Sequence, residues 1–203
     1  MNLFISGWAG FREALGNIPE EWNFVCPFID FNEEELISFL REKSGQTVVG
    51  WSTGGHIILK NLKFFADRFE KIIVVAGFIK FTKYVNSRVL RRMIDRMAKK
   101  PEDVVKEFLI SAGCNSLFPK FEKAKLIEGL NFLISSEVVD FPQIKGKLIL
   151  IHGIHDRILP VDALKELNTV FPFAKSFLLS RPHWIGFEEI LKARTLGFPQ
   201  GSC

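Results

Sequence analysis

A serine flanked by glycines, Ser52, has the neighbours that nucleophilic chemistry requires. It lies in the stretch Gly-Trp-Ser-Thr-Gly-Gly at 50–55, after the short apolar run Thr47–Val49 and before an apolar helical run. A tight turn from strand to helix strains the backbone of its central residue and lifts the hydroxyl above the sheet edge. The flanking glycines are needed because a β-carbon at 50 or 54 would collide with the opposing backbone. The pattern predicts a nucleophile, and the alternative is a structural turn.

A serine hydroxyl needs a base to remove its proton, and the positions of the four histidines differ. His183 follows the last predicted strand, 175–179, at the carboxyl edge of the sheet. Ligand-binding and catalytic sites lie at this edge in open α/β sheets. Of the others, His56 lies on the helix after Ser52, His152 lies at a strand end, and His155 lies beside the best candidate aspartate. We therefore expect His183 to be the base. The alternative is a solvent-exposed loop histidine.

The acid that orients this base is expected from the loop one strand earlier. Asp156 lies in the loop 153–160, directly after the apolar strand 147–151. A carboxylate here would stay ionised and hold the imidazole in the right tautomer. The alternative is an aspartate that only caps a turn. The chain order Ser52, Asp156, His183 is that of α/β-hydrolases, and it differs from the orders of chymotrypsin and subtilisin.

Two backbone N–H groups are expected to stabilise the negative charge that develops on the substrate oxygen. One belongs to Thr53, the residue after the nucleophile. The other comes from the loop after the first strand, where Trp8 lies between Gly7 and Gly10. The alternative is that Trp8 only closes the core.

Apolar, β-branched runs alternate with helical stretches, which predicts a parallel sheet covered on both faces. We expect about six strands, at 3–5, 24–28, 47–49, 71–76, 147–151 and 175–179, and the main helices at 32–43, 54–65, 162–170 and 184–193. Asn32 and Glu35 would form a capping box at the start of the first helix. From 78 to 142 the alternation stops and several helices are expected. The fold class is therefore α/β: one domain over 1–203, with a short, mostly parallel sheet and a helical cap inserted at 78–142 after the fourth strand.

The composition fits one ordinary globular domain, with 203 residues, 47% of them hydrophobic and 25% charged. No apolar run approaches the roughly 20 residues of a membrane-spanning helix, and the start lacks the basic region of a signal peptide. The cysteines, Cys26, Cys114 and Cys203, are too widely spaced for a zinc site and odd in number, which indicates free thiols. We expect a cytoplasmic monomer with no metal, no cofactor and no membrane partner.

The net charge of +4 is unevenly distributed along the chain. Residues 78–125 carry twelve Lys or Arg and five Asp or Glu, a net charge of +7. Such a face would attract an acidic partner, and the alternative is a solvated charged surface. Nucleic acid is not expected, because no aromatic residues that could stack on bases are interleaved with these charges.

Together the motifs resemble the pimeloyl-[acyl-carrier protein] methyl ester esterases of biotin synthesis. The resemblance covers nearly the whole chain. It is carried by Gly50-Trp51-Ser52-Thr53-Gly54-Gly55, the loop Ser6-Gly7-Trp8-Ala9-Gly10, the motif Gly153-x-x-Asp156-x-x-Leu159-Pro160, and His183. Two features depart from the family. Ser6-Gly7 stands where relatives usually have His-Gly before the oxyanion tryptophan, and the sequence begins at what would be the third strand of a full hydrolase sheet.

The resemblance implies hydrolysis of the methyl ester at the far end of a pimeloyl chain carried by acyl carrier protein. Ser52, Asp156 and His183 would be catalytic, and Trp8 and Thr53 would form the oxyanion hole. Phe108 and Ala112 would line the acyl channel. The residues that would contact the carrier protein are Arg88, Arg91, Arg92 and Arg96. The alternatives are an esterase or thioesterase for a small free acyl substrate, and a hydrolase-fold binding protein with little turnover.

Overall fold

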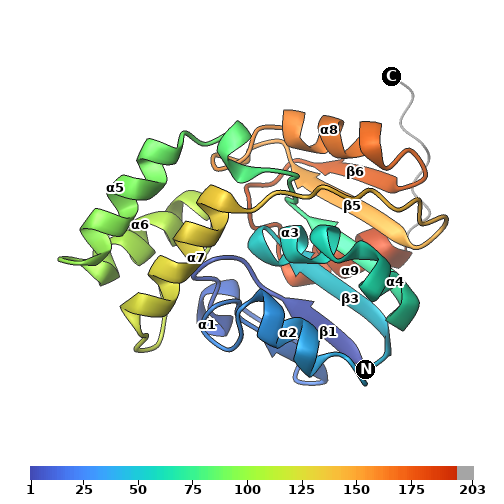
Figure 1. Cartoon of the computed structure of the whole chain (residues 1–203), viewed down its shortest axis with the longest axis horizontal. Coiled ribbons are helices and arrows are strands. Elements are labelled where there is room, and N and C mark those ends of the chain that lie inside the picture. Colours follow the sequence, from blue (N-terminus) through green and yellow to red (C-terminus); the bar gives the residue numbers. More distant parts are fainter. Residues whose placement is uncertain (196–203) are drawn as a thin grey trace.

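Six short apolar runs form one parallel sheet in the order β2-β1-β3-β4-β5-β6 (Figure 1). The structure is a computed structural model and describes residues 1–195. The strands are β1 (Asn2–Ile5), β2 (Trp22–Val25), β3 (Gly45–Trp51), β4 (Phe69–Val75), β5 (Leu148–Gly153) and β6 (Lys175–Leu179). The predicted α/β class and the six parallel strands are confirmed. Because all the strands are parallel, their carboxyl ends meet at one edge.

Helices cover both faces of the sheet, so the central strands are buried on both sides. On one face lie α2 (Glu33–Phe39), α3 (Thr53–Lys60), α4 (Leu62–Arg68) and α8 (Asp162–Val170). The other face packs against α1 (Arg12–Leu15) and α9 (Phe187–Thr195). Neighbouring residues such as Val48 and Val49 are both fully buried although they point to opposite faces. This is why these strands are continuous apolar runs and do not alternate.

Several boundaries differ from those predicted. The helix expected at 54–65 is two helices, because the Asn61 side chain donates to the Ile57 carbonyl (3.1 Å) and to Glu33 (2.7 Å) where the chain leaves helical geometry. The strand expected at 24–28 ends at Val25. The last helix begins at Phe187 and not at residue 184, after a glycine with positive φ. The capping box between Asn32 and Glu35 is confirmed.

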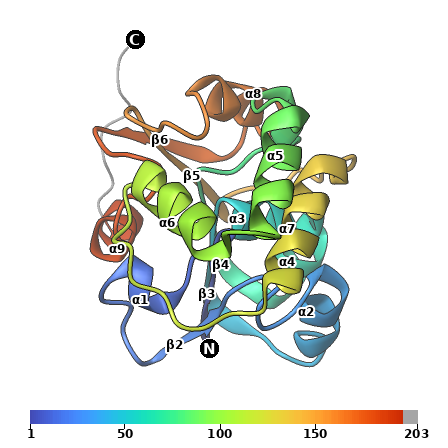
Figure 2. The ribbon, with the colours of Figure 1, turned by 90° about the vertical axis from the view of Figure 1, so that its left-hand side faces the viewer.

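The segment 78–142, which we call the cap, is helical, as expected. It contains η1 (Phe81–Lys83), α5 (Ser87–Met97), α6 (Pro101–Ala112) and α7 (Lys123–Ser135). In Figure 1 these three α-helices lie to the left of the sheet, beyond the ends of the strand arrows, and in Figure 2 they face the viewer. The description of 1–203 as one domain with an inserted cap stays a prediction.

Two further predictions concern the cysteines and the membrane. Cys26 is buried and Cys114 partly buried, both as free thiols, while Cys203 lies outside the described residues. Within residues 1–195, no helix combines the length and the apolar character needed to cross a membrane.

Candidate active site

The turn from β3 into α3 holds Ser52 in a conformation that few residues adopt, with φ of +52° and ψ of −113°. It is fixed by the Ser52 N–H, which donates to the Val75 carbonyl at 2.8 Å. A β-carbon at Gly54 would lie 2.1 Å from the Ile5 carbonyl oxygen, and one at Gly50 would lie 2.7 Å from the Gly54 backbone. The glycines are therefore required by the close approach of backbone, as the sequence suggested.

The structure brings Ser52, His183 and Asp156 into one hydrogen-bonded line. The Nε2 atom of His183 lies 2.9 Å from Ser52 Oγ, and its Nδ1 atom lies 2.6 Å from Asp156 Oδ2. The three side chains follow the ends of β3, β5 and β6; β5 and β6 are neighbours in the sheet, and β4 lies between β3 and β5. This arrangement can pass a proton from the hydroxyl to an imidazole that a carboxylate orients.

Asp156 is held as a carboxylate by three hydrogen-bonding groups. Its Oδ1 atom accepts from the N–H groups of Ile158 (2.7 Å) and Leu159 (2.8 Å), and its Oδ2 atom faces His183. Burial raises the pKa of Asp156, but the charge and hydrogen bond of His183 and the two N–H bonds together outweigh it and leave the pKa below its ordinary value. The carboxyl is therefore ionised and can stabilise an imidazolium.

His152 also contacts this acid, which the sequence did not indicate. Its Nε2 atom lies 3.1 Å from the Leu159 carbonyl oxygen and 3.6 Å from Asp156 Oδ2. Burial lowers the pKa of His152, so this imidazole is neutral near pH 7 and can donate from Nε2 to the loop. The i,i+4 spacing across the end of β5 was the only signal available. His56 and His155 make no contact with the line; His155 bonds Ser180 at 3.0 Å.

Trp51 is a second residue whose role was not predicted, although it lies in the serine motif. Its indole Nε1 donates to the backbone carbonyl oxygen of His183 at 2.9 Å. The ring also packs against Trp184, with the ring centroids 5.2 Å apart. The residue before Ser52 therefore holds the backbone of His183. A motif alone could not indicate this contact, which joins positions 132 residues apart.

The loop after β1 lies against the start of α3, as expected for an oxyanion hole. The Trp8 N–H donates to the side-chain oxygen of Thr53 at 3.2 Å, and the Trp8 indole donates to the Leu126 carbonyl at 2.8 Å. The hydroxyl of Ser6 donates to the Gly10 carbonyl at 2.5 Å and closes the loop on itself. As the first residue of α3, Thr53 has a backbone N–H for which the helix offers no acceptor.

The cap closes over this site. The ring of Phe108 on α6 meets Trp8 edge-on with a centroid separation of 4.9 Å, and the Ala112 carbonyl accepts from the Trp184 N–H at 2.8 Å. Only 3% of Ser52 is exposed, and His183 is fully buried. The residues predicted to line an acyl channel are thus beside the site, with the cap in a closed position.

The four predicted carrier-contact arginines lie on α5, exposed and apart from the buried line of Ser52, His183 and Asp156. Arg96 is bonded through both terminal nitrogens to Glu107 of α6, at 2.7 Å each. The other three are exposed: Arg88, Arg91 and Arg92. They can meet a partner on the outside of the cap but cannot touch the reacting atoms in this closed structure.

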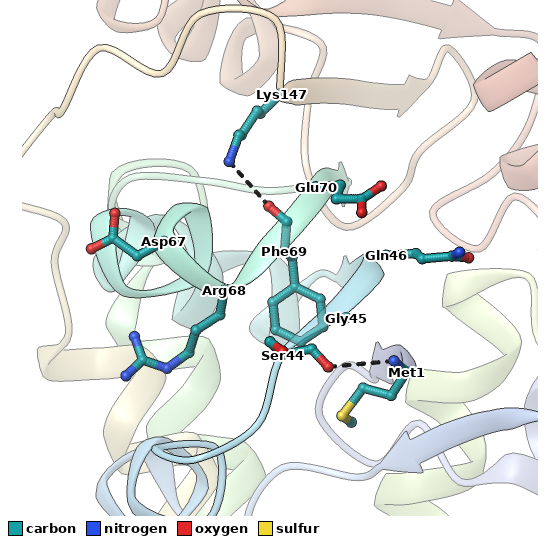
Figure 3. Close-up of a pocket in the computed structure, with 9 residues that line it drawn as sticks. All are labelled: Met1, Ser44, Gly45, Gln46, Asp67, Arg68, Phe69, Glu70 and Lys147. Carbon is teal, nitrogen blue, oxygen red and sulfur yellow. Dashed lines mark hydrogen bonds between the residues drawn. The ribbon is translucent and has the colours of Figure 1, made fainter.

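A surface hollow of about 380 Å³ lies elsewhere on the molecule, and Figure 3 shows the residues that line it. It is lined by residues at the amino ends of the strands, including Gly45 and Gln46 of β3 and Phe69 and Glu70 of β4. The candidate residues lie at the opposite, carboxyl edge. None of them lines this hollow.

The sheet order, the strained serine turn and the helical cap after the fourth strand are those of the α/β-hydrolase fold, and comparison with solved structures agrees. The chain is similar to an esterase from Exiguobacterium antarcticum, with a TM-score of 0.69 and 15% identity over 96% of this chain and 89% of the other. A hydrolase from Oleispira antarctica matches with a TM-score of 0.64 and 11% identity, over 96% and 86%. BioG from Haemophilus influenzae matches with a TM-score of 0.58 and 12% identity, over 93% of each chain. Scans against protein-family models and curated protein sequences find no match.

Proposed function

We propose that the protein is a serine carboxylesterase in which Ser52, His183 and Asp156 act as a catalytic triad. The observation that carries the proposal is the pair of contacts of one imidazole, 2.9 Å to Ser52 Oγ and 2.6 Å to Asp156 Oδ2. A serine at its ordinary pKa is a poor nucleophile, and an oriented base is what activates it. The esterases and hydrolases among the similar structures share the fold and make this reaction class a natural expectation.

In the first half of the reaction, Ser52 Oγ attacks the ester carbonyl carbon while His183 Nε2 takes the hydroxyl proton. The carbonyl oxygen becomes an anion stabilised by the N–H groups of Trp8 and Thr53. Asp156 stabilises the imidazolium. His183 then gives the proton to the leaving alkoxide, the carbon–oxygen bond breaks, and methanol departs from a methyl ester, which leaves an acyl group on Ser52.

In the second half, a water molecule replaces methanol. His183 takes a proton from the water as its oxygen attacks the acyl carbon, and a second tetrahedral anion forms in the same hole. Its collapse returns the proton to Ser52 Oγ and releases the carboxylic acid. The net change is ester plus water to acid plus methanol.

For the substrate we propose the methyl ester of a pimeloyl chain on acyl carrier protein, in cytoplasmic biotin synthesis. The support is the resemblance of the serine, oxyanion-loop and aspartate motifs, together with an apolar site wall at Phe108 and Ala112. Arg88, Arg91 and Arg92 are exposed on the cap, where an acidic carrier could be attracted. The carrier would remain outside while its acyl chain enters.

The deciding experiment is a mass-spectrometric assay of pimeloyl-carrier methyl ester, in which loss of the methyl group is followed with time. Wild-type protein should convert it, and the Ser52→Ala variant should not. Retained activity in Ser52→Ala would rule out the mechanism. The same assay with the free methyl ester, at low and at high salt, separates the substrate classes. Equal rates on both substrates at both salt concentrations would contradict the carrier-bound substrate.

The second candidate is an esterase or thioesterase for a small free acyl compound. The observation that favours it is the closed site, in which Phe108 lies against Trp8 and leaves Ser52 only 3% exposed. A hydrolase-fold binding protein with little turnover is the remaining alternative. A fluorophosphonate probe that failed to label Ser52 would favour this third reading.

A further inference from the structure

The side chain of Thr53 occupies an unexpected position in the candidate oxyanion hole. Its Oγ1 atom accepts a hydrogen bond from the Trp8 N–H at 3.2 Å, and both residues are buried. That N–H is also one of the two groups expected to bind the substrate oxygen. A side-chain oxygen therefore lies in front of a proposed oxyanion donor.

If the Thr53 side chain keeps this position, its oxygen and the substrate oxygen compete for the same donor. A substrate oxygen bound to the Trp8 N–H must lie in the same cone of space as Thr53 Oγ1, because hydrogen bonds at an N–H are strongly directional. Two oxygens so close together repel unless one donates a hydrogen bond to the other. The oxygen of a tetrahedral intermediate has only lone pairs, so the threonine must be the donor.

The Thr53 hydroxyl is free to donate a hydrogen bond to the substrate oxygen. A threonine hydroxyl has one proton and two acceptor lone pairs, and the Trp8 N–H uses one of the lone pairs. Among the hydrogen bonds between residues 1–195, none has the Thr53 hydroxyl as its donor. In a site that excludes water, an unpaired O–H beside a developing negative charge forms a strong, charge-assisted bond.

We propose that the Thr53 hydroxyl is a third donor of the oxyanion hole. In the structure it accepts from the Trp8 N–H and holds the loop after β1 against α3. When the tetrahedral intermediate forms, its negatively charged oxygen accepts hydrogen bonds from the backbone N–H groups of Trp8 and Thr53. The Thr53 hydroxyl donates a third hydrogen bond to the same oxygen. This inference rests on the proposed Ser52 esterase chemistry but not on the identity of the natural acyl group.

The opposite reading is that the hydroxyl blocks the hole and must rotate away before substrate binds. The two readings predict opposite effects for the same substitution. Removing a donor that acts in the transition state lowers kcat, whereas removing a plug leaves kcat unchanged or raises it.

The test compares Thr53→Val, which removes the hydroxyl at nearly the same volume, with Thr53→Ser, which keeps it. Thr47→Val is a matched control: Thr47 is also fully buried, and its hydroxyl has no hydrogen-bond partner. Activity is followed with p-nitrophenyl butyrate, so the assay does not depend on the carrier. We expect kcat to fall by about tenfold to a hundredfold in Thr53→Val with KM changed by less than about threefold. The kcat of Thr53→Ser should stay within about threefold of the wild-type value, and the kcat of Thr47→Val should equal the wild-type value.

A second measurement uses a trifluoromethyl ketone, which forms a tetrahedral adduct with a reactive serine. Its affinity should fall in Thr53→Val by about the same factor as kcat. If Thr53→Val does not fold, Thr53→Ala takes its place with the same expected loss. Wild-type or higher kcat without the hydroxyl, or equal losses in the valine and serine variants, would overturn the proposal. If Ser52→Ala remained active, the proposed function itself would fail, which is a different outcome.

Discussion

The indole nitrogen of Trp51 donates to the backbone carbonyl oxygen of His183 at 2.9 Å, so the residue before Ser52 holds the loop that carries His183. Through this bond the strained turn at Ser52 and the loop after β6 are fixed to each other. The distance from Oγ to the imidazole therefore depends on both segments.

The Trp51→Phe substitution should remove this hydrogen bond while keeping most of the aromatic packing. The His183 carbonyl would lose its buried partner, which costs about 1–3 kcal/mol of unfolding free energy. Because the base would be held less firmly, we expect kcat to fall by about tenfold or more. Urea unfolding and steady-state kinetics measure the two effects. Trp22→Phe, a buried tryptophan that packs on Phe187, is the control and should lower stability without a comparable loss of kcat.

The Asp156→Asn substitution tests the orienting acid. An amide that places its NH₂ group toward His183 favours the wrong tautomer, in which Nε2 carries the proton and cannot accept one from Ser52. A loss of kcat of about four orders of magnitude is expected, by analogy with the same change in a serine protease. Asp162→Asn, an exposed aspartate on α8 paired with Lys165, is the control and should retain activity. A mild effect at 156 would remove this carboxylate from the mechanism.

The exposed arginines of α5 test the proposed acidic partner. Replacing Arg88, Arg91 and Arg92 together by glutamate should lower kcat/KM for the carrier-bound ester by about tenfold or more at low salt, because attraction becomes repulsion. Hydrolysis of p-nitrophenyl butyrate should not change, since these side chains lie outside the site. Arg41→Glu, an exposed arginine beyond α2, serves as a control for surface charge. If both substrates were affected alike, the arginines would not be a docking surface.

Buried His56 should make stability depend on pH. It is enclosed on α3, with Nδ1 at 3.0 Å from the Phe78 carbonyl and Nε2 at 2.8 Å from Ser136 Oγ, and both partners belong to the cap. Burial is the main cause that lowers the pKa of His56 to about 4. The hydrogen bond to Phe78 and the charge of Glu33 raise this pKa by smaller amounts, and the charge of Lys60 lowers it. The ordinary value is 6.5, so between about pH 6.5 and 4 the unfolded chain binds more protons than the folded one.

Stability should therefore fall on acidification in this window. From pH 7.5 to pH 5 the contribution of His56 is about 2 kcal/mol, measured by urea unfolding at each pH. His56→Gln, which retains a group that can bond Ser136 but does not titrate, should give a shallower slope. Some slope will remain, because the pKa of His152 is also lowered by burial. An unchanged slope in His56→Gln would contradict this assignment.

The sequence could predict those parts of the site that local geometry and strand order determine. The glycines around Ser52 are a local steric requirement, and the loops holding Asp156 and His183 follow strands whose parallel direction brings their ends to one edge. The contacts of Trp51 with His183, of His152 with the Asp156 loop, and of Thr53 with Trp8 depend on side-chain conformation and on packing between distant segments. Apart from the i,i+4 spacing of His152 and Asp156, no pattern of residue types indicates these contacts. The break at Asn61 depended in the same way on Glu33, a residue from another helix.

The contact between α6 and the loop of the base has a kinetic consequence. In the proposed reaction an ester carbonyl must reach Ser52, which is 3% exposed, so α6 is expected to move and the bond from the Trp184 N–H to the Ala112 carbonyl is expected to break. Each turnover of the proposed esterase would then include an opening step, and the rate of that step would be an upper limit on kcat. In such a scheme a partner that stabilises the open form would lower KM without touching a single reacting atom.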